Sequence, residues 1–155
     1  MLSRRDWLLV TLSAATTALT ARRLSAGMPR ARKIAVYKSP TCSCCQNWVA
    51  HMKSKGFVVD AHDVDERKLP EIKDSAGIPA KLRSCHVALA NGYAFEGHVP
   101  ADLVEKVLST KPKLSGLAVP GMPVGSPGME VGAPKDRYDV VAFGRDGRTW
   151  VFARR

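Results

Sequence analysis

Residues 33–56, KIAVYKSPTCSCCQNWVAHMKSKG, decide the fold of this chain. The run 33–38 is mostly apolar and β-prone, which predicts a strand, and the Ser-Pro-Thr that follows ends it. A helix is expected over residues 43–55, because Gly56 supplies a stop signal. Apolar side chains recur on this helix with the spacing i, i+3, i+4 and i+7, which marks a buried face. The residues of this face are Cys45, Trp48, Val49 and Met52.

The pattern continues as far as residue 112. The elements predicted next are a strand over 57–64, a short helix over 69–76, a hairpin over 87–97 and a helix over 100–110. The hairpin has the strongest signal, because Asn91-Gly92 suits a type I′ turn. The order strand, helix, strand, helix, hairpin, helix is that of a thioredoxin-like domain. We therefore expect an α/β fold with a thioredoxin-like domain over residues 33–112.

The segment 113–134 has a different composition. Nine of the twenty residues from 115 to 134 are glycine or proline, so no regular structure is expected there. Pro-Gly-Met occurs twice in this stretch, at residues 120–122 and 127–129. A loop of this length without regular structure is often functional. Two short apolar runs in the last segment, 135–155, then predict a C-terminal β-hairpin followed by a basic tail.

The N-terminus predicts export from the cytoplasm. Residues 1–26 combine Arg4-Arg5 with an uncharged stretch over 7–21, which resembles a twin-arginine export signal. That stretch is shorter than the ~20 apolar residues of a membrane-spanning helix. Cleavage after residue 21 or residue 26 is open, and so is an uncleaved signal, which would then be the only contact with the membrane. The expected location is the periplasm.

Charge and motifs exclude several classes of function. The formal net charge is +10 over the whole chain and +7 without residues 1–26. The basic residues are scattered and form no stripe interleaved with aromatic residues, so nucleic-acid binding is not expected. The sequence also lacks a phosphate-binding Gly-Lys-Ser/Thr loop, a G-x-G-x-x-G, a G-x-S-x-G and an H-E-x-x-H motif.

The chain has four cysteines, and three of them lie in Cys-Ser-Cys-Cys at residues 42–45. Two structural disulfides are one interpretation, but a bridge between the neighbours Cys44 and Cys45 would be strained. Crowded thiolates suit a metal ion, and the start of a helix stabilises them. Cys42 and Cys45 also have the Cys-x-x-Cys spacing of redox proteins, so dithiol chemistry remains an alternative.

Distant residues extend this candidate site. In a thioredoxin-like arrangement the loop that carries Cys85 and His86 faces the start of the first helix, so Cys85 would complete the cluster. His86 would either bind metal or orient a cysteine. His98, after the hairpin, is a weaker candidate. Several thiolates select Cu(I), zinc or iron–sulfur clusters. The thioethers of Met122 and Met129 favour Cu(I) over zinc, unless both only fill gaps in packing.

The ordered motifs resemble one known family. They are the cysteine motif at 37–45, Ser-Cys-His at 84–86, Glu-Gly-His-Val-Pro at 96–100 and the loop at 116–129. Together they resemble the CopG-like copper-resistance proteins, domain-of-unknown-function family 411. The resemblance covers residues 34–132 and implies a periplasmic, thioredoxin-like protein that holds copper. It implies these metal ligands: Cys42, Cys44, Cys45, Cys85, His86, Met122 and Met129.

Two hypotheses about function follow. In the first, the protein binds one or several Cu(I) ions for copper resistance or homeostasis, without turnover. In the second, it is a periplasmic oxidoreductase that cycles either the pair Cys42 and Cys45 or the copper itself. The expected partners are copper ions and copper efflux or chaperone proteins. The sequence does not decide whether the protein is an enzyme.

Overall fold

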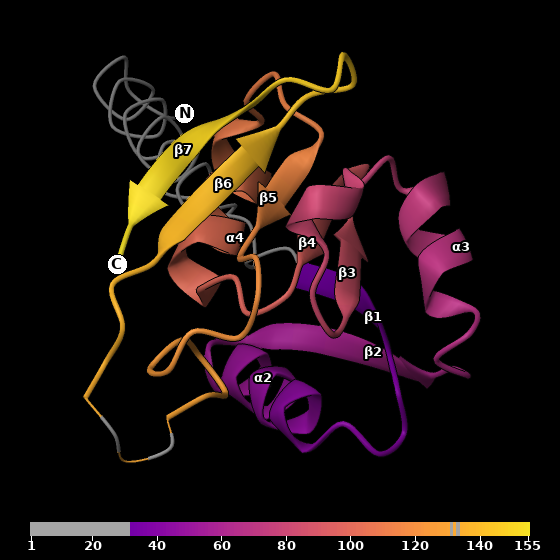
Figure 1. Ribbon diagram of the computed structural model, residues 1–155, viewed down its shortest axis with the longest axis vertical. Helices are drawn as coiled ribbons and strands as arrows, with labels where there is room; N and C mark the ends of the chain where they lie inside the picture. The colour runs from indigo at the N-terminus through magenta and orange to yellow at the C-terminus, as the bar shows by residue number, and fades with distance from the viewer. Residues whose placement is uncertain (1–31, 131, 133) are drawn as a thin grey trace, which may run out of the picture. The chain divides into compact units, whose positions relative to one another are not determined.

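The structure is a computed structural model that describes residues 32–130, 132 and 134–155. The predicted export signal over residues 1–26 lies outside this range. The described elements, in chain order, are β1 (Arg32–Lys38), α2 (Ser43–Ser54), β2 (Phe57–Asp63), α3 (Leu69–Ser75), the 3₁₀-helix η2 (Ala80–Leu82), β3 (Val87–Ala90), β4 (Tyr93–Glu96), α4 (Ala101–Thr110), β5 (Gly116–Ala118), β6 (Asp139–Phe143) and β7 (Thr149–Arg154). Up to α4, the strands and α-helices follow the predicted order (Figure 1).

One mixed sheet of seven strands organises the protein, in the order β2-β1-β3-β4-β5-β6-β7. Strand β1 is parallel to β2 and antiparallel to β3, with Tyr37 opposite Val87. The end of β1 and the start of β3 therefore lie side by side. This register brings the cysteine motif after β1 close to the Cys85 segment that precedes β3. The mixed α/β class expected from the sequence is confirmed.

Strand β5 was not expected, because it lies in the Gly- and Pro-rich segment. It pairs in parallel with β4, and a Cβ atom at Gly116 would lie only 1.9 Å from the Ala94 carbonyl oxygen. Glycine thus allows β4 and β5 to approach, while the Leu117 side chain is fully buried. The prediction of no regular structure is wrong for these three residues. Strand β5 also pairs with β6, so the predicted hairpin β6–β7 belongs to the same sheet.

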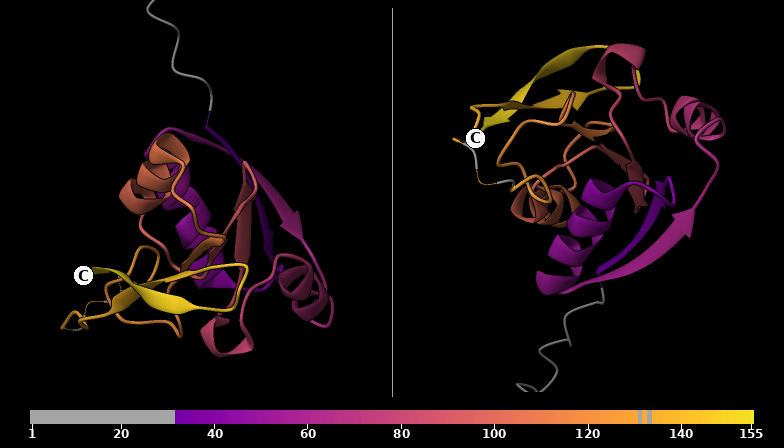
Figure 2. Two further views of the ribbon diagram at one scale, coloured as in Figure 1. Left: turned by 90° about the horizontal axis from the view of Figure 1, so that it is seen from above. Right: turned by 60° about the horizontal axis from the view of Figure 1, so that its bottom comes forward.

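The helices divide between the two faces of the sheet. Helices α2 and α4 lie side by side on one face and α3 lies on the other (Figure 2). The larger hydrophobic cluster lies under α2 and α4 and contains Trp48, Phe95 and Leu117. The smaller cluster contains Ile78, Phe143 and other residues of the opposite face. All four residues predicted to form the inner face of α2 are buried, as expected.

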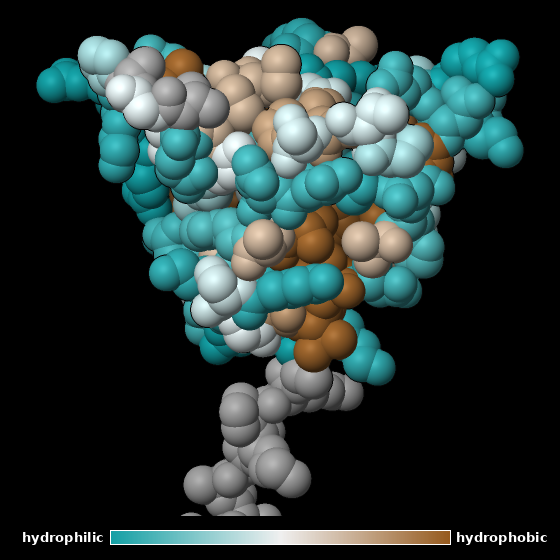
Figure 3. Space-filling view, turned by 90° about the horizontal axis from the view of Figure 1, so that it is seen from below, coloured by the Kyte–Doolittle hydropathy of each residue, from teal (hydrophilic) through white to brown (hydrophobic). Residues whose placement is uncertain are grey.

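Few large apolar side chains are exposed among the described residues. They are Val58, Met122, Trp150 and Val151. The face drawn in Figure 3 is mainly hydrophilic, with a band of hydrophobic residues across it. Within the described residues, no helix has the length and apolar character needed to cross a membrane. Met122 differs from the other three, because its side chain contains a sulfur atom.

Candidate metal centre

The cysteine motif occupies the start of α2. Cys42 is the N-cap residue, and the backbone N–H of Cys45 donates to its Sγ at 3.3 Å. The chain enters the helix through a turn in which the Cys42 N–H donates to the Ser39 carbonyl at 3.3 Å. The free N–H groups and the dipole of a helix start stabilise negative charge on sulfur. The location therefore suits thiolate chemistry.

Four cysteine sulfurs meet at this helix start. The sulfurs of Cys42, Cys44, Cys45 and Cys85 all lie within 4.8 Å of one another. Cys42 and Cys45 form a disulfide, with their Cα atoms 5.3 Å apart, whereas Cys44 and Cys85 are free. The Sγ of Cys44 lies 3.4 Å from the Sγ of Cys42. In the described state the cluster thus holds one disulfide and two free thiols.

The Cys85 thiol lies between two imidazole rings. Its Sγ is 3.2 Å from Nδ1 of His86 and 3.2 Å from Nε2 of His98. Burial raises the pKa of Cys85 to about 12, and the nearby Cys44 adds to the rise. Burial has this effect because it disfavours the charged thiolate. Cys85 is therefore a neutral thiol near neutral pH, and a cation that binds it must displace its proton.

His98 has a defined hydrogen-bonding arrangement. Its Nδ1 lies 2.8 Å from the Pro127 carbonyl oxygen, and because a carbonyl only accepts, Nδ1 must carry the hydrogen. Burial lowers the pKa of His98, so the ring is neutral and Nε2 has no proton. That bare nitrogen faces Cys85. Histidines that bind metals commonly donate their other N–H to a backbone carbonyl in this way.

His86 is fully buried and has one ring nitrogen without a partner. Its Nε2 makes no hydrogen bond to any described residue. Burial, His98 and two nearby lysines lower its pKa well below the ordinary value, so the ring is neutral. The ring centroid lies 4.7 Å from that of Trp48, whose indole N–H donates to the Val99 carbonyl at 2.9 Å. The nitrogen that faces Cys85 is Nδ1, so Nδ1 is the His86 atom placed to bind an ion beside this sulfur, while Nε2 stays buried without a partner among the described residues.

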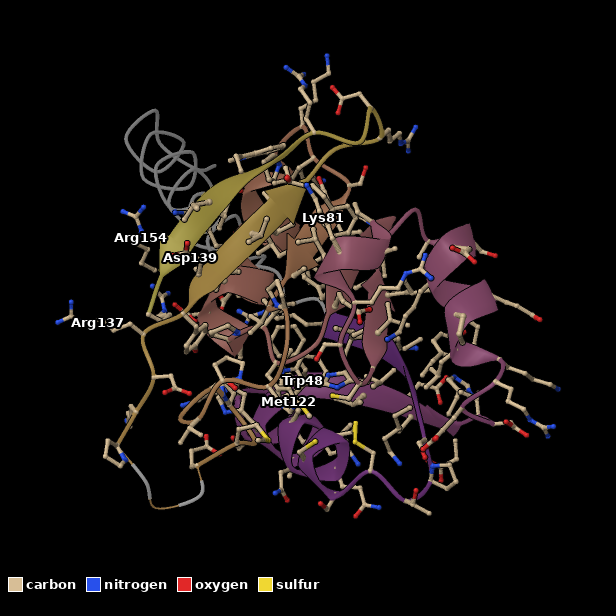
Figure 4. All side chains as sticks on the ribbon, in the orientation of Figure 1. Trp48, Lys81, Met122, Arg137, Asp139 and Arg154 are labelled. Carbon is tan, nitrogen blue, oxygen red and sulfur yellow. A yellow bond between two sulfur atoms is a disulfide. The ribbon has the colours of Figure 1, made fainter. Side chains whose placement is uncertain are left out.

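The Gly- and Pro-rich segment runs from β5 down to α2 and back to β6 (Figure 1). Gly128 lies against the helix start: a Cβ atom there would be 2.7 Å from the Trp48 backbone nitrogen and 2.9 Å from the Cys44 carbonyl oxygen. Figure 4 shows Met122 beside α2, close to Trp48. The Sδ of Met122 lies 4.0 Å from the Sγ of Cys44, although its side chain is largely exposed. This loop therefore borders the sulfur cluster.

A pocket beside α3 gives solvent access to the cluster. It has a volume of about 360 Å³, and Cys42 and Cys85 are both in its wall. The rest of its lining comes largely from α3 and from Arg83 and Ser84. A larger cavity of about 820 Å³ lies beside the β3–β4 hairpin, and no cysteine lines it. The pocket at the sulfurs is the one that matters for chemistry at this site.

The structure brings together six of the seven ligands expected from the sequence. The four cysteines form one cluster, His86 contacts Cys85, and Met122 contacts Cys44. Met129 forms hydrogen bonds within the described residues only through its backbone. His98, a weaker candidate from the sequence, lies as close to the Cys85 sulfur as His86 does. A signal was Gly97, whose φ of +69° permits the turn that brings His98 beside Cys85.

Comparison with known proteins gives a consistent picture. A family model described as "Protein of unknown function, DUF411" matches residues 82–129. A solved structure titled "Copper resistance protein copG- Form 1" is 40% identical, with a TM-score of 0.76, and the match covers 81% of this chain and 98% of the other. The corresponding "Form 2" structure is also 40% identical, with a TM-score of 0.75, covering 81% and 99%. No curated protein matches the chain.

Proposed function

This chain belongs to the DUF411 family of CopG-like proteins, and from this premise we propose that it binds Cu(I) through its cysteine cluster in copper resistance or homeostasis. The observation that carries the proposal is the convergence of four sulfurs within 4.8 Å of one another. Copper is the cargo in this proposal and not a resident cofactor.

The donor set fits a soft cation. Thiolates and thioethers select Cu(I), and a cluster of sulfurs can bridge several ions. Zinc is the less favoured metal, because Met122 next to Cys44 adds a thioether that zinc sites do not use. Cys42 and Cys45 must first be reduced by a dithiol reductant, which supplies two electrons and two protons, yields two thiols and itself becomes a disulfide. Cu(I) then displaces the thiol protons.

The proposed ligands differ in strength. Cys42, Cys44, Cys45 and Cys85 supply the anionic sulfurs that hold the ion. The neutral rings of His86 and His98 lie at the Cys85 end of the cluster, where each can supply a nitrogen or orient the cysteine. Met122 and Met129 supply weaker thioether contacts from the loop.

A dithiol oxidoreductase is the second candidate function. The specific observation in its favour is the disulfide between Cys42 and Cys45 at a helix start. The strand order β2-β1-β3-β4 with α2 following β1 is consistent with a thioredoxin-like domain, which we also propose. In this alternative a substrate dithiol, or two Cu(I) ions that become Cu(II), would supply the two electrons that reduce the disulfide, and a substrate disulfide or two Cu(II) ions would take them back.

We further propose a periplasmic location, reached by the twin-arginine route, with efflux or chaperone proteins as copper partners. The basis is the sequence of residues 1–26, together with the copper-resistance name of the solved relatives. Fractionation of cells that express the full chain with Arg4→Lys and Arg5→Lys tests the route. Efficient recovery of this variant from the periplasm would reject it.

The experiment that tests the function is anaerobic Cu(I) titration of the reduced protein against a chelator of known affinity. Cys42→Ser, Cys45→Ser or Cys85→Ser should each abolish most of the copper binding. Met122→Leu with Met129→Leu should bind copper but release it faster, because leucine keeps the volume and removes the sulfur. Met52→Leu is the matched control, since Met52 is fully buried in the hydrophobic core.

Three outcomes separate the alternatives. Copper displaced by equimolar zinc would reject the Cu(I) proposal. Copper release from the methionine double variant at the wild-type rate would show that neither methionine binds copper and that both serve only in packing. Catalytic disulfide exchange that needs only Cys42 and Cys45, without tight Cu(I) binding, would instead support the oxidoreductase.

A further inference from the structure

We propose, resting on the copper function above, that the buried ion pair between Lys73 and Glu96 is a positioning device that fixes the Cys85 segment against the cysteine motif. Lys73 comes from α3 and Glu96 from the end of β4. Their side chains are 5% and 0% exposed, and the Nζ to Oε1 distance is 2.8 Å. Neither residue belongs to the proposed ligand set.

The pair holds both backbone groups of Ser84, the residue before Cys85. Lys73 Nζ donates to the Ser84 carbonyl at 2.5 Å, and the Ser84 N–H donates to Oε1 of Glu96 at 2.5 Å. A residue whose N–H and carbonyl are both bound to buried charges cannot rotate without breaking a charge-assisted hydrogen bond. The position of the Cys85 sulfur therefore depends on Lys73 and Glu96.

The same network reaches the other parts of the site. The Ser84 hydroxyl donates to the Gly121 carbonyl at 2.5 Å, next to Met122 in the loop. The backbone N–H of Val119 donates to the Glu96 carbonyl at 3.0 Å, at the start of that loop. The backbone N–H of Gly97 donates to the His86 carbonyl at 2.9 Å, which ties the two histidine-bearing segments together.

Stability alone is a poor explanation for this pair. Removing two charges from water costs about as much as their attraction returns, and apolar replacements of buried pairs are often neutral or stabilising. The pair also leaves one oxygen of Glu96, Oε2, without a hydrogen-bond partner among the described residues, which adds to the cost. In α3 the buried side chains are Leu69 and Lys73, so an apolar residue would have suited position 73. What an apolar pair cannot do is hold both backbone groups of Ser84.

The decisive variant replaces both members, Lys73→Met with Glu96→Met, because a single replacement would leave an unpaired buried charge. We expect its resistance to denaturant to match or exceed that of the wild type. Cu(I) release to a chelator should accelerate about 10-fold or more, the usual effect of removing groups that orient metal ligands. Alkylation of Cys85 by iodoacetamide in the copper-free, disulfide-bonded protein should accelerate as well, because the sulfur is no longer held in its buried position.

Two controls accompany this variant. Glu96→Gln leaves the Lys73 charge unpaired and should lower stability, but it keeps the acceptor oxygen for the Ser84 N–H, so Cys85 alkylation under native conditions should stay near the wild-type rate. Asp65→Asn with Arg67→Met removes an exposed pair of a basic and an acidic side chain. It should leave the rates of Cu(I) release and Cys85 alkylation unchanged. Wild-type rates of both copper release and Cys85 alkylation in the double methionine variant would overturn the proposal.

A measurement on the wild-type protein covers the case in which the double variant does not fold. The Ser84 amide should exchange with solvent at the slow rates of the central strands, because its acceptor is buried. Exchange at the rate of an open loop would overturn the proposal. Alkylation and amide exchange need no copper, so they test the positioning role independently of copper binding. Failure of the wild-type protein to bind Cu(I) would reject the proposed function and not the positioning role.

Discussion

At the scale of single residues, Cys85 has an unusual environment for the metal ligand that we propose it to be. It is a partly buried thiol that contacts two neutral imidazoles, and its pKa is raised to about 12. Burial is the largest cause of the rise, and the proximity of Cys44 is the next. A thiol of this kind reacts poorly with electrophiles until its proton is removed. Burial disfavours the charged thiolate. A soft cation that replaces the proton would offset the charge of the thiolate, so the same burial would then shield the bound ion from solvent.

The raised pKa predicts a particular pH dependence of alkylation. In the disulfide-bonded protein, the rate for Cys85 with iodoacetamide should keep rising up to pH 10, because the thiolate fraction is still small there. N-acetylcysteine, with an ordinary thiol, should level off near pH 9–10. Mass spectrometry of the modified peptides gives the rate for Cys85 separately from that for Cys44. A plateau for Cys85 below pH 9 would contradict the burial argument, and Cys44→Ser should lower the pKa only in part.

At the scale of elements, the site depends on how the loop after β5 meets α2. Gly128 has a φ of +88° and lies against the backbone of the first helical turns, so the contact has no room for a side chain. Its N–H donates to Oε2 of Glu130 at 2.8 Å, and the neighbouring Pro127 accepts from His98. The loop therefore contacts both the start of α2 and His98, a proposed ligand.

Gly128→Ala should displace this loop. A left-handed φ costs a residue with a Cβ roughly 1–2 kcal/mol, and the clash with backbone atoms of Trp48 and Cys44 adds to that cost. Gly147→Ala is the matched control, because Gly147 has a φ of +77° but no atom within 4 Å of its would-be Cβ. Denaturant unfolding should show a larger loss for Gly128→Ala, and Cu(I) release should accelerate for that variant alone. Equal effects on both measurements would mean that the loop does not close the site.

At the scale of the whole molecule, one sheet connects the strands β1 to β4 to the C-terminal hairpin β6–β7. Strand β5 pairs with β4 on one side and with β6 on the other. Val140, Ala142 and Phe143 of β6 are fully buried, and they pack into the hydrophobic clusters of both faces. The hairpin therefore completes the core and does not merely follow it.

Deletion of residues 135–155 should for this reason destabilise the whole protein. Each large buried apolar side chain contributes ~1.5–3 kcal/mol, and a domain has only ~5–15 kcal/mol of net stability. Thermal unfolding of the truncated chain should be non-cooperative or begin at a much lower temperature. Trp150→Ser with Val151→Thr, which alters exposed residues of β7, should leave the transition nearly unchanged. Cooperative melting of the truncated chain near the full-length temperature would show that the chain up to residue 134 folds without the hairpin.

The sequence by itself determined the local structure and the type of chemistry. Periodicity identified the buried face of α2, and Asn91-Gly92 identified the β3–β4 turn, because both are properties of neighbouring residues. The spacing of the cysteine motif and the repeated Pro-Gly-Met indicated soft-metal or dithiol chemistry in the same way. Residue types and their spacing are sufficient for such inferences.

Only the tertiary structure decided which distant groups meet. The sequence does not predict strand β5, because the strand forms only by pairing with β4 and β6 and needs a residue without a side chain at Gly116. The place of His98 in the candidate site follows from its contacts with Cys85 and Pro127, and both residues are distant from it in the sequence. From the sequence alone, the charged side chains of Lys73 and Glu96 would both be expected on the surface. Their burial and their hold on Ser84 arise from packing between α3 and the sheet, and no local pattern encodes such long-range contacts.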